Sequence, residues 1–236
     1  MLLYGPTPAG EALARCEQML VRAGRSRLME ANVTSSTAGL LAMRGRFDET
    51  RELVDRARRT YDELGLVLAA AGLSNVAAES ELLAGEPEAA AALLYEGYDS
   101  LPAMARAHRA ALLAEAMYAL ARFDEARVLA DECRAAAGSH ALSHVSWRAV
   151  HAGIAAREER FDEAEELARE AVELVDRMDA PNLRGDARIR LAEVLRLADR
   201  RDEASAVTRE ALILYERKGN LVSAERAKAL LAERVR

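Results

Sequence analysis

The stretch Ala-Arg-Phe-Asp-Glu-Ala at residues 121–126 decides the fold, because close copies of it recur along the chain. The copies are Gly-Arg-Phe-Asp-Glu-Thr at 45–50, Gly-Glu-Pro-Glu-Ala-Ala at 85–90, Glu-Arg-Phe-Asp-Glu-Ala at 159–164 and Asp-Arg-Arg-Asp-Glu-Ala at 199–204. Their third positions, 47, 87, 123, 161 and 201, are 40, 36, 38 and 40 residues apart. Such a period indicates a repeat architecture, in which each repeat is one supersecondary unit.

Each copy has the features of a turn that leads into a helix. Its acidic residues fall in the first helical turn, where carboxylates favour the positive end of the helix dipole. Before each copy lies another stretch of helical period, at about 26–44, 66–84, 102–120, 140–158 and 183–198. One helical hairpin cannot bury its own apolar face, but stacked hairpins can. The sequence therefore predicts a stack of helix pairs.

Composition also favours helices and a packed core. Of the 236 residues, 51% are hydrophobic and 51 are alanine, whereas only three are isoleucine. Alanine, leucine, glutamate and arginine are strong helix formers, while β-branched and aromatic residues favour strands. Together with the helical period, this composition predicts an all-α fold.

The sequence argues against several classes of protein. No stretch reaches the roughly 18 to 20 uninterrupted apolar residues of a membrane helix, and the first residues lack the pattern of a secretory signal. Cys16 and Cys133 are too few and too far apart for a disulfide framework or a zinc pattern. The net charge of −6 argues against a nucleic-acid footprint. We expect a cytoplasmic protein that binds neither membranes nor nucleic acid.

The pattern resembles tetratricopeptide repeats. Small residues stand in the middle of each first helix, at Ala38, Ala78, Ala114, Ala152 and Ala192. A second set follows in the second half of each repeat, at Ala57, Gly97, Cys133, Ala171 and Ala211. The resemblance implies a right-handed α-solenoid of stacked antiparallel helix pairs with about 12 helices.

We expect a single solenoid over residues 1–236, with an incoming helix at 7–23, five repeats of about 38 residues over 28–218 and a closing helix at 220–234. The period exceeds the 34 residues usual for this family. The family's large aromatic residue early in the first helix is replaced by Thr34, Ser74, Ala110, Arg148 and Arg188.

A narrower resemblance covers about the first 65 residues. The segments 4–17 and 42–49 are similar to helical regions of large actinobacterial signalling proteins, in which a cyclase or transcription-factor module and an ATPase precede the repeats. This resemblance implies a regulatory role for the chain.

The sequence lacks the motifs of the common enzyme classes. It has no phosphate-binding Gly-x-x-x-x-Gly-Lys loop, no dinucleotide-binding glycine motif, no Gly-x-Ser-x-Gly and no His-Glu-x-x-His. Its acidic pairs recur at helix starts, where they stabilise the helix rather than form an acid/base pair. We expect no catalytic residues, no cofactor and no enzymatic activity.

The histidines can be interpreted either as packing residues or as a functional site. His140, His144 and His151 have helical spacing beside Trp147, and His108 lies in the preceding repeat. We interpret this stripe as packing between helices. A metal or pH-sensing site is the alternative, and so is a metalloenzyme.

The tetratricopeptide resemblance places partner contacts on the concave face, at positions two, five, nine, twelve and thirteen of each repeat. Carried onto this sequence, the candidates are Asn32, Ser35, Asn75, Glu79, His108, Glu115, Tyr118, Ser146, Arg157, Asp186, Glu193 and Arg196. The lysine and asparagine clamp that some members use for C-terminal carboxylates is absent, because the first helices contain no lysine. The remaining Glu and Arg residues favour a polar peptide or protein surface.

The leading functional hypothesis is a non-catalytic scaffold that binds a peptide or protein on its concave face. The alternative is a ligand-sensing regulatory module that controls a signalling enzyme or a transcription factor through a peptide or small effector. The closing helix has one apolar stripe, typical of a cap, which predicts a monomer, with a dimer as the alternative.

Overall fold

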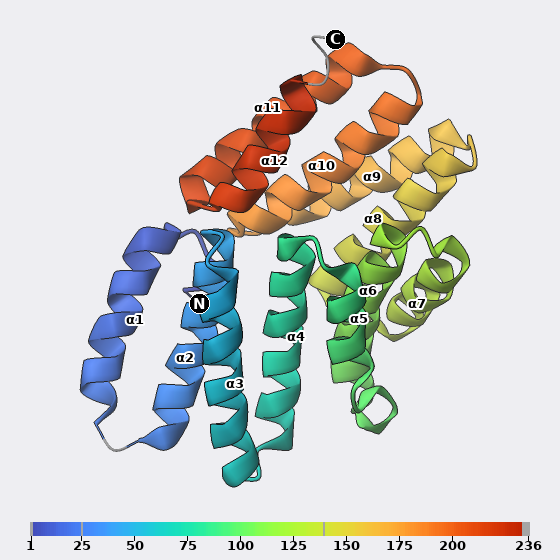
Figure 1. Ribbon diagram of the computed structural model, residues 1–236. Coiled ribbons are helices and arrows are strands. Elements are labelled where there is room, and N and C mark those ends of the chain that lie inside the picture. Colours follow the sequence, from blue (N-terminus) through green and yellow to red (C-terminus); the bar gives the residue numbers. More distant parts are fainter. Residues whose placement is uncertain (1, 25, 139, 233–236) are drawn as a thin grey trace.

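The computed structural model describes residues 2–24, 26–138 and 140–232. Within these ranges the chain forms twelve α-helices, one short 3₁₀-helix (η1, Tyr98–Ser100) and no strand (Figure 1). The α-helices are α1 (Ala9–Ala23), α2 (Arg27–Met43), α3 (Phe47–Glu63), α4 (Val67–Ala84), α5 (Pro87–Tyr95), α6 (Ala103–Ala119), α7 (Phe123–Ala136), α8 (Ala141–Arg157), α9 (Phe161–Asp176), α10 (Pro181–Leu197), α11 (Arg201–Lys218) and α12 (Leu221–Ala232). The predicted all-α class and helix number are confirmed.

Consecutive helices pack as pairs, and the pairs stack. Each first helix contacts its own second helix, as α2 does with α3 and α10 with α11. The first helices also contact one another in series, from α2 to α4, α6, α8 and α10. Every boundary of these first helices lies within two residues of the sequence prediction. The last two residues of the predicted closing helix, 233 and 234, lie outside the described residues.

The turns between paired helices share one backbone conformation. The residue that opens each repeated stretch has a positive φ, between +57° and +87°, in all five copies: Gly45, Gly85, Ala121, Glu159 and Asp199. The next amide then donates back to the last turn of the first helix, as Arg122 N does to Met117 O at 2.9 Å. This left-handed cap ends the first helix and satisfies its carbonyls. The second helix begins two residues later.

The small repeat positions let the helices approach closely. Ala38, Ala78, Ala114 and Ala152 are at most 1% exposed, and Cys133 is completely buried in the same way. Gly97 is the exception, because α5 ends at Tyr95 and Gly97 stands in an exposed, left-handed turn. The second repeat therefore has a short second helix.

Polar contacts link the helices where the family's aromatic residue is missing. Arg188 binds Asp176 with both terminal nitrogens at 2.9 Å and Glu210 with Nε at 3.0 Å. Arg148 donates to Glu170 at 2.6 Å, and Ser74 accepts from Arg58 at 2.6 Å. Charge-assisted bonds of this type hold a helix to its neighbour more strongly than neutral ones.

Helix α4 is long and apolar, and it packs between its neighbours in the stack. Its 18 residues have a mean hydropathy of 1.2, which is long and apolar enough to cross a membrane by length and composition alone. In the folded chain it packs against α2, α3, α5 and α6. Within the described chain, 39% of this helix is buried.

The superhelix turns until its two ends meet. In Figure 1, α10, α11 and α12 cross the upper ends of the first four helices, and α12 contacts α2. Arg226 of α12 donates to the carbonyl oxygen of Leu83 in α4 at 2.8 Å. Lys218, at the end of α11, binds backbone carbonyls of the segment before α1. Helices from both ends of the chain therefore enclose a common interior.

Candidate functional site

A groove runs through the interior of the superhelix, with a cavity of about 560 Å³. We call it the central groove. Its walls come from α2, α4, α6, α8, α10 and α12, with one tyrosine from α11 and two residues from the segment before α1. Its polar lining residues include Tyr4, Glu79, Glu115, Tyr118, Asn182, Asp186, Arg190, Glu193, Tyr215, Asn220 and Arg226. In tetratricopeptide repeats the first helix of each pair is expected to line the interior, and the first helices α2, α4, α6, α8 and α10 do so here.

Two glycines make room for the groove's tyrosines. A Cβ atom at Gly153 of α8 would overlap the hydroxyl end of Tyr118, and one at Gly185 of α10 would lie 2.5 Å from the ring of Tyr215. Each tyrosine ring therefore lies close to a helix backbone, at a position where glycine leaves room for it. The hydroxyls then reach acidic residues on α10: Tyr118 donates to Glu193 at 3.0 Å and Tyr215 donates to Asp186 at 2.7 Å.

Two arginines enclose the ring of Tyr118. The guanidinium carbon of Arg190 lies 3.9 Å from the ring centroid and that of Arg157 lies 4.6 Å from it. Arg190 also pairs with Glu193 at 2.6 Å and with Glu115 at 2.7 Å, and Arg157 pairs with Glu193 at 2.7 Å. Cation–π contacts and ion pairs thus join α6, α8 and α10 at one point of the groove.

Within this cluster, opposite charges balance the cost of burial. Burial alone raises the pKa of Glu193, but the guanidiniums of Arg190 and Arg157 outweigh it and leave the pKa below its usual range. Burial acts on Arg190 in the opposite sense, and the carboxylates of Glu115 and Glu193 raise its pKa. This part of the groove is therefore satisfied by its own residues.

A second acidic pair in the groove has no such balance. Among the described side chains, Glu79 of α4 accepts a hydrogen bond only from the hydroxyl of Tyr4, at 3.0 Å, and Asp186 only from that of Tyr215. Within the described ranges, neither carboxylate has a basic nitrogen closer than 4.0 Å. Burial and the charge of Asp186 raise the pKa of Glu79 to about 7, despite the hydrogen bond from Tyr4.

Asp186 shows the same effect in a more open position. Its side chain is exposed to the groove, yet surrounding protein keeps much of the bulk water away. Burial and the charge of Glu115 raise its pKa to about 6, although Tyr215, Arg190 and Arg226 oppose the shift. Two carboxylates that both resist ionisation therefore face the same space.

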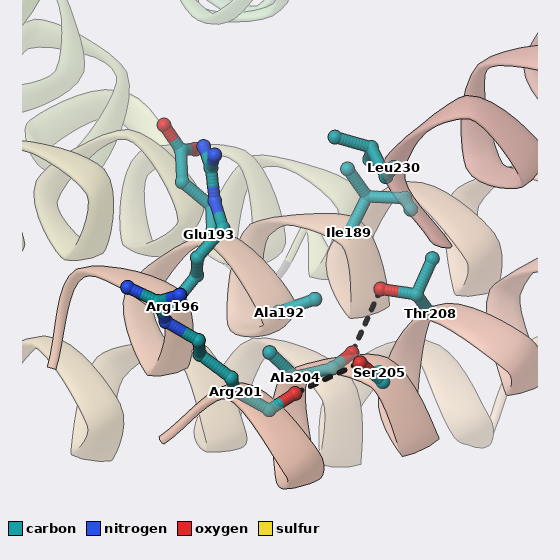
Figure 2. A pocket seen from close by; sticks show the side chains of 9 residues that line it. All are labelled: Ile189, Ala192, Glu193, Arg196, Arg201, Ala204, Ser205, Thr208 and Leu230. Atoms are coloured by element: carbon teal, nitrogen blue, oxygen red, sulfur yellow. Dashed lines mark hydrogen bonds between the residues drawn. The ribbon is translucent and has the colours of Figure 1, made fainter. Parts of the chain in front are cut away.

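A second cavity of about 460 Å³ extends the groove between α10, α11 and α12. It shares Ile189, Glu193 and Leu230 with the central groove. In Figure 2, Arg196 and Arg201 lie at one end of this cavity, and Ile189 and Leu230 lie at the other. The hydroxyls at its base donate to backbone carbonyls of their own helix. Two arginines thus lie at one end of the second cavity, and one of them, Arg201, pairs with Asp199 at 3.1 Å.

Seven of the twelve predicted contact residues line these two cavities. They are Glu79, Glu115, Tyr118, Ser146, Asp186, Glu193 and Arg196. Arg157 reaches the groove through Tyr118, as described above. The other four residues do not line either cavity. Asn32 accepts a hydrogen bond from the hydroxyl of Tyr61, and Asn75 accepts one from Arg109. Ser35 is half-buried, and burial lowers the pKa of His108.

Six of the polar groove residues were not predicted from the sequence: Tyr4, Asn182, Arg190, Tyr215, Asn220 and Arg226. A signal existed for Arg190, because it stands four residues after Asp186 and three before Glu193 on one helix face. No local pattern could place Tyr4 and Arg226, which enter the groove only because the ends of the chain meet.

Trp147 contacts two of the histidines, because its Nε1 donates to His144 Nδ1 at 3.4 Å and its ring packs edge-on against His151. His140 Nδ1 lies 3.0 Å from the hydroxyl of Ser143, His144 Nε2 lies 2.9 Å from the carbonyl of Gly138, and His151 Nε2 lies 3.2 Å from Asp131. His140 precedes α8 rather than lying in it. In the described part of the chain, no group of three or more His, Cys, Asp and Glu side chains is arranged to hold a metal ion.

Comparison with known proteins identifies the fold. No family model and no curated protein matches the chain. Among solved structures, a Rap protein complexed with competence and sporulation factor matches with a TM-score of 0.62 and 13% identity, over 94% of this chain and 68% of that one. A signal transduction ATPase with a tetratricopeptide repeat sensor, from Pyrococcus horikoshii, matches with 0.60 and 14%, over 95% and 36%.

A third solved structure, the nearly identical TPR-like repeats of a putative kinesin light chain from Podosopora anserina, matches with a TM-score of 0.51 and 16% identity, over 80% of this chain and 96% of that one. At these identities the likeness concerns the fold. The chain has the fold of tetratricopeptide repeat proteins, as its repeat pattern predicted.

Proposed function

We propose that this chain is a protein-interaction scaffold that binds a segment of a partner protein in the central groove, with a positively charged side chain between Glu79 and Asp186. The observation that carries the proposal is this acidic pair, which lacks a cationic partner within the described residues. Elsewhere in the same groove each carboxylate has an arginine within 2.7 Å.

Physical chemistry favours a cationic occupant at this point. Carboxylates held away from bulk water are costly unless a positive charge compensates them. A guanidinium or ammonium between the two would replace two neutral hydrogen bonds by charge-assisted ones, which are about twice as strong. The apolar walls formed by Leu83, Leu112 and Leu142 would take the rest of the segment.

Extended segments suit the groove's length. The central groove and the second cavity share Ile189, Glu193 and Leu230, so a segment that spans both would meet Glu79 and Asp186 in one and Arg196 and Arg201 in the other. A partner segment with a basic residue followed by an acidic group fits that order. The Rap structure, which was solved with competence and sporulation factor, provides a precedent within this fold.

A partner-independent experiment tests the proposal. A random peptide library displayed on phage is selected on the purified chain and, in parallel, on a Glu79→Gln, Asp186→Asn double variant. We expect peptides selected on the wild type to be enriched in lysine and arginine, and the enrichment to disappear on the double variant.

The matched control is Glu52→Gln with Asp55→Asn, which removes two exposed carboxylates from α3. This control is expected to select the same peptides as the wild type. The proposal fails if selected peptides show no excess of basic residues, or if the groove variant and the control behave alike.

The closure of the superhelix favours a second candidate, a ligand-sensing module. The groove is lined by helices from both ends of the chain, so an effector that bridges Glu79 of α4 and Asp186 of α10 would draw the ends together. A signal transduction ATPase with a tetratricopeptide repeat sensor has the same fold, and this likeness supports a sensing role. Small-angle scattering separates the two: a sensor contracts on binding a selected peptide, whereas a rigid scaffold keeps its radius of gyration.

A further inference from the structure

The segment Leu2–Pro8 precedes α1 and is attached to the far end of the chain. We call it the strap. It forms turns rather than a helix, and three of its carbonyl oxygens converge on the ammonium of Lys218 in α11. The Nζ atom donates to Leu2 O at 3.1 Å, to Gly5 O at 2.7 Å and to Thr7 O at 2.9 Å. These bonds use all three donors of the ammonium.

A lysine is rarely buried without a carboxylate partner, and Lys218 is such a residue. It is completely buried, and no carboxylate lies within 4.0 Å of it in the described ranges. Burial lowers the pKa of its ammonium to about 8. A buried lysine that is held by carbonyls alone binds one particular chain conformation, because a slight displacement of the strap leaves a charge unsatisfied.

The strap places two side chains in the central groove. Leu3 is 7% exposed and lies in a notch at Gly39 of α2, where an added Cβ would come within 2.7 Å of the leucine. It also packs in the same cluster as Val76 of α4. Tyr4 follows it and donates its hydroxyl to Glu79. The strap thus covers the acidic residue to which the partner's cation is assigned above.

We propose that the strap is an intramolecular ligand of the central groove, latched by Lys218, and that a partner segment must displace it to reach Glu79. The displacing segment needs an aliphatic side chain for the notch at Gly39 and a cationic donor for Glu79. This inference rests on the proposed function for the partner, but the docking of the strap is testable without any partner.

The chemistry of Glu79 explains how displacement can occur. Tyr4 offers a neutral O–H donor and stays 44% exposed, so its hydrogen bond has only the modest net strength of a neutral donor. A guanidinium or ammonium makes a stronger bond to the same carboxylate. At Glu79 itself, a cationic competitor would therefore make a stronger bond than the Tyr4 hydroxyl that it replaces.

Thiol labelling measures whether the strap covers the groove. The background carries Cys16→Ala and Cys133→Ala, and Val76→Cys places a thiol under Leu3. The probe is N-ethylmaleimide, and its rate is followed by mass spectrometry for the full strap, for Lys218→Met and for a chain lacking residues 2–8. Ser146→Cys, a groove position on α8, is the matched control.

We expect release of the latch to raise the labelling rate of Val76→Cys about tenfold or more, because labelling follows the population of the open state. The rate at Ser146→Cys should stay the same. A cooperative thermal transition in each variant shows that the solenoid is folded, and the strap variant Leu3→Ser provides the same test with Lys218 intact. Equal rates at Val76→Cys with and without the strap would overturn the proposal.

A second measurement connects the strap to the partner. A peptide selected by phage display on the wild type should bind Lys218→Met about tenfold more tightly, since a competent state that is seldom populated weakens apparent affinity in proportion. If the labelling result holds but affinity is unchanged, the strap docks without competing, and the competitive part of the proposal is wrong. If no peptide is selected at all, the partner proposal fails while the labelling result still decides the strap.

Discussion

Replacing Glu79 by glutamine removes a charge from the central groove and keeps the shape of the side chain. The amide oxygen can still accept the hydroxyl of Tyr4, which lies 3.0 Å from the carboxylate. The substitution therefore isolates the cost of holding a negative charge beside Asp186. We expect the variant to be more stable than the wild type at neutral and alkaline pH.

The size of the effect follows from proton linkage. The pKa of Glu79 is raised from 4.5 to about 7, so the folded chain binds a proton that the unfolded chain releases between these values. The stabilising contribution of this proton is fully present below pH 4.5 and is lost as the pH rises through 7. At 1.36 kcal/mol per unit, and allowing for water in the groove, removal of the charge gains about 1–3 kcal/mol above pH 7.

Urea denaturation followed by circular dichroism measures the difference. At about pH 8, Glu79→Gln should unfold at higher urea than the wild type, whereas at about pH 4 the two should nearly coincide. Glu52→Gln, an exposed change on α3, should shift stability by less than about 0.5 kcal/mol at either pH. The reasoning is refuted if Glu79→Gln is no more stable than the wild type at alkaline pH, or if its gain does not depend on pH.

Three further predictions concern the scaffold. Ala121→Gly should raise stability by about 0.5–1 kcal/mol in urea melts, because alanine there has a φ of +57°, whereas Ala92→Gly within α5 should lower it by about 1 kcal/mol. Arg188→Met should lower the free energy of unfolding by about 1–3 kcal/mol, because its two carboxylate partners lose their shared cation; an unchanged urea midpoint would contradict this. Gly153→Ala should lower the thermal midpoint and weaken peptide binding, since the new methyl group displaces Tyr118.

The parts of the fold that local sequence determines were predictable. The helix expected at 66–84 spans Val67–Ala84, and the one at 102–120 spans Ala103–Ala119. Helical period, turn residues and small packing positions are all read within about 40 residues, which is the length of one repeat. The left-handed caps at Ala121, Glu159 and Asp199 were harder to predict, because glycine is the residue that indicates a positive φ in a sequence.

The shape of the superhelix was not predictable in the same way. Curvature is the sum of small rotations between successive repeats, and a small change in each one would separate the ends of the chain. The contact between Lys218 and the carbonyl of Leu2 joins residues that are 216 positions apart. The candidate site was therefore predictable only in part. The positions of the tetratricopeptide resemblance predicted Glu79 and Asp186 as contact residues. Their proximity and their lack of a cationic partner depend on the closure of the superhelix.

The proposed binding would involve the same residues as the closure of the superhelix, which sets a condition on the proposed partner. The charge of Asp186 opposes the ionisation of Glu79 across the groove, whereas the Lys218 latch and the bond from Arg226 to Leu83 hold the ends of the chain together. A ligand can shift such a balance only by its difference in affinity for the two states. In the proposed complex, a cation between the two carboxylates would be attracted to both, so it would stabilise the closed form and offset the loss of the strap. A neutral segment leaves the repulsion in place and has no such means of holding the ends together.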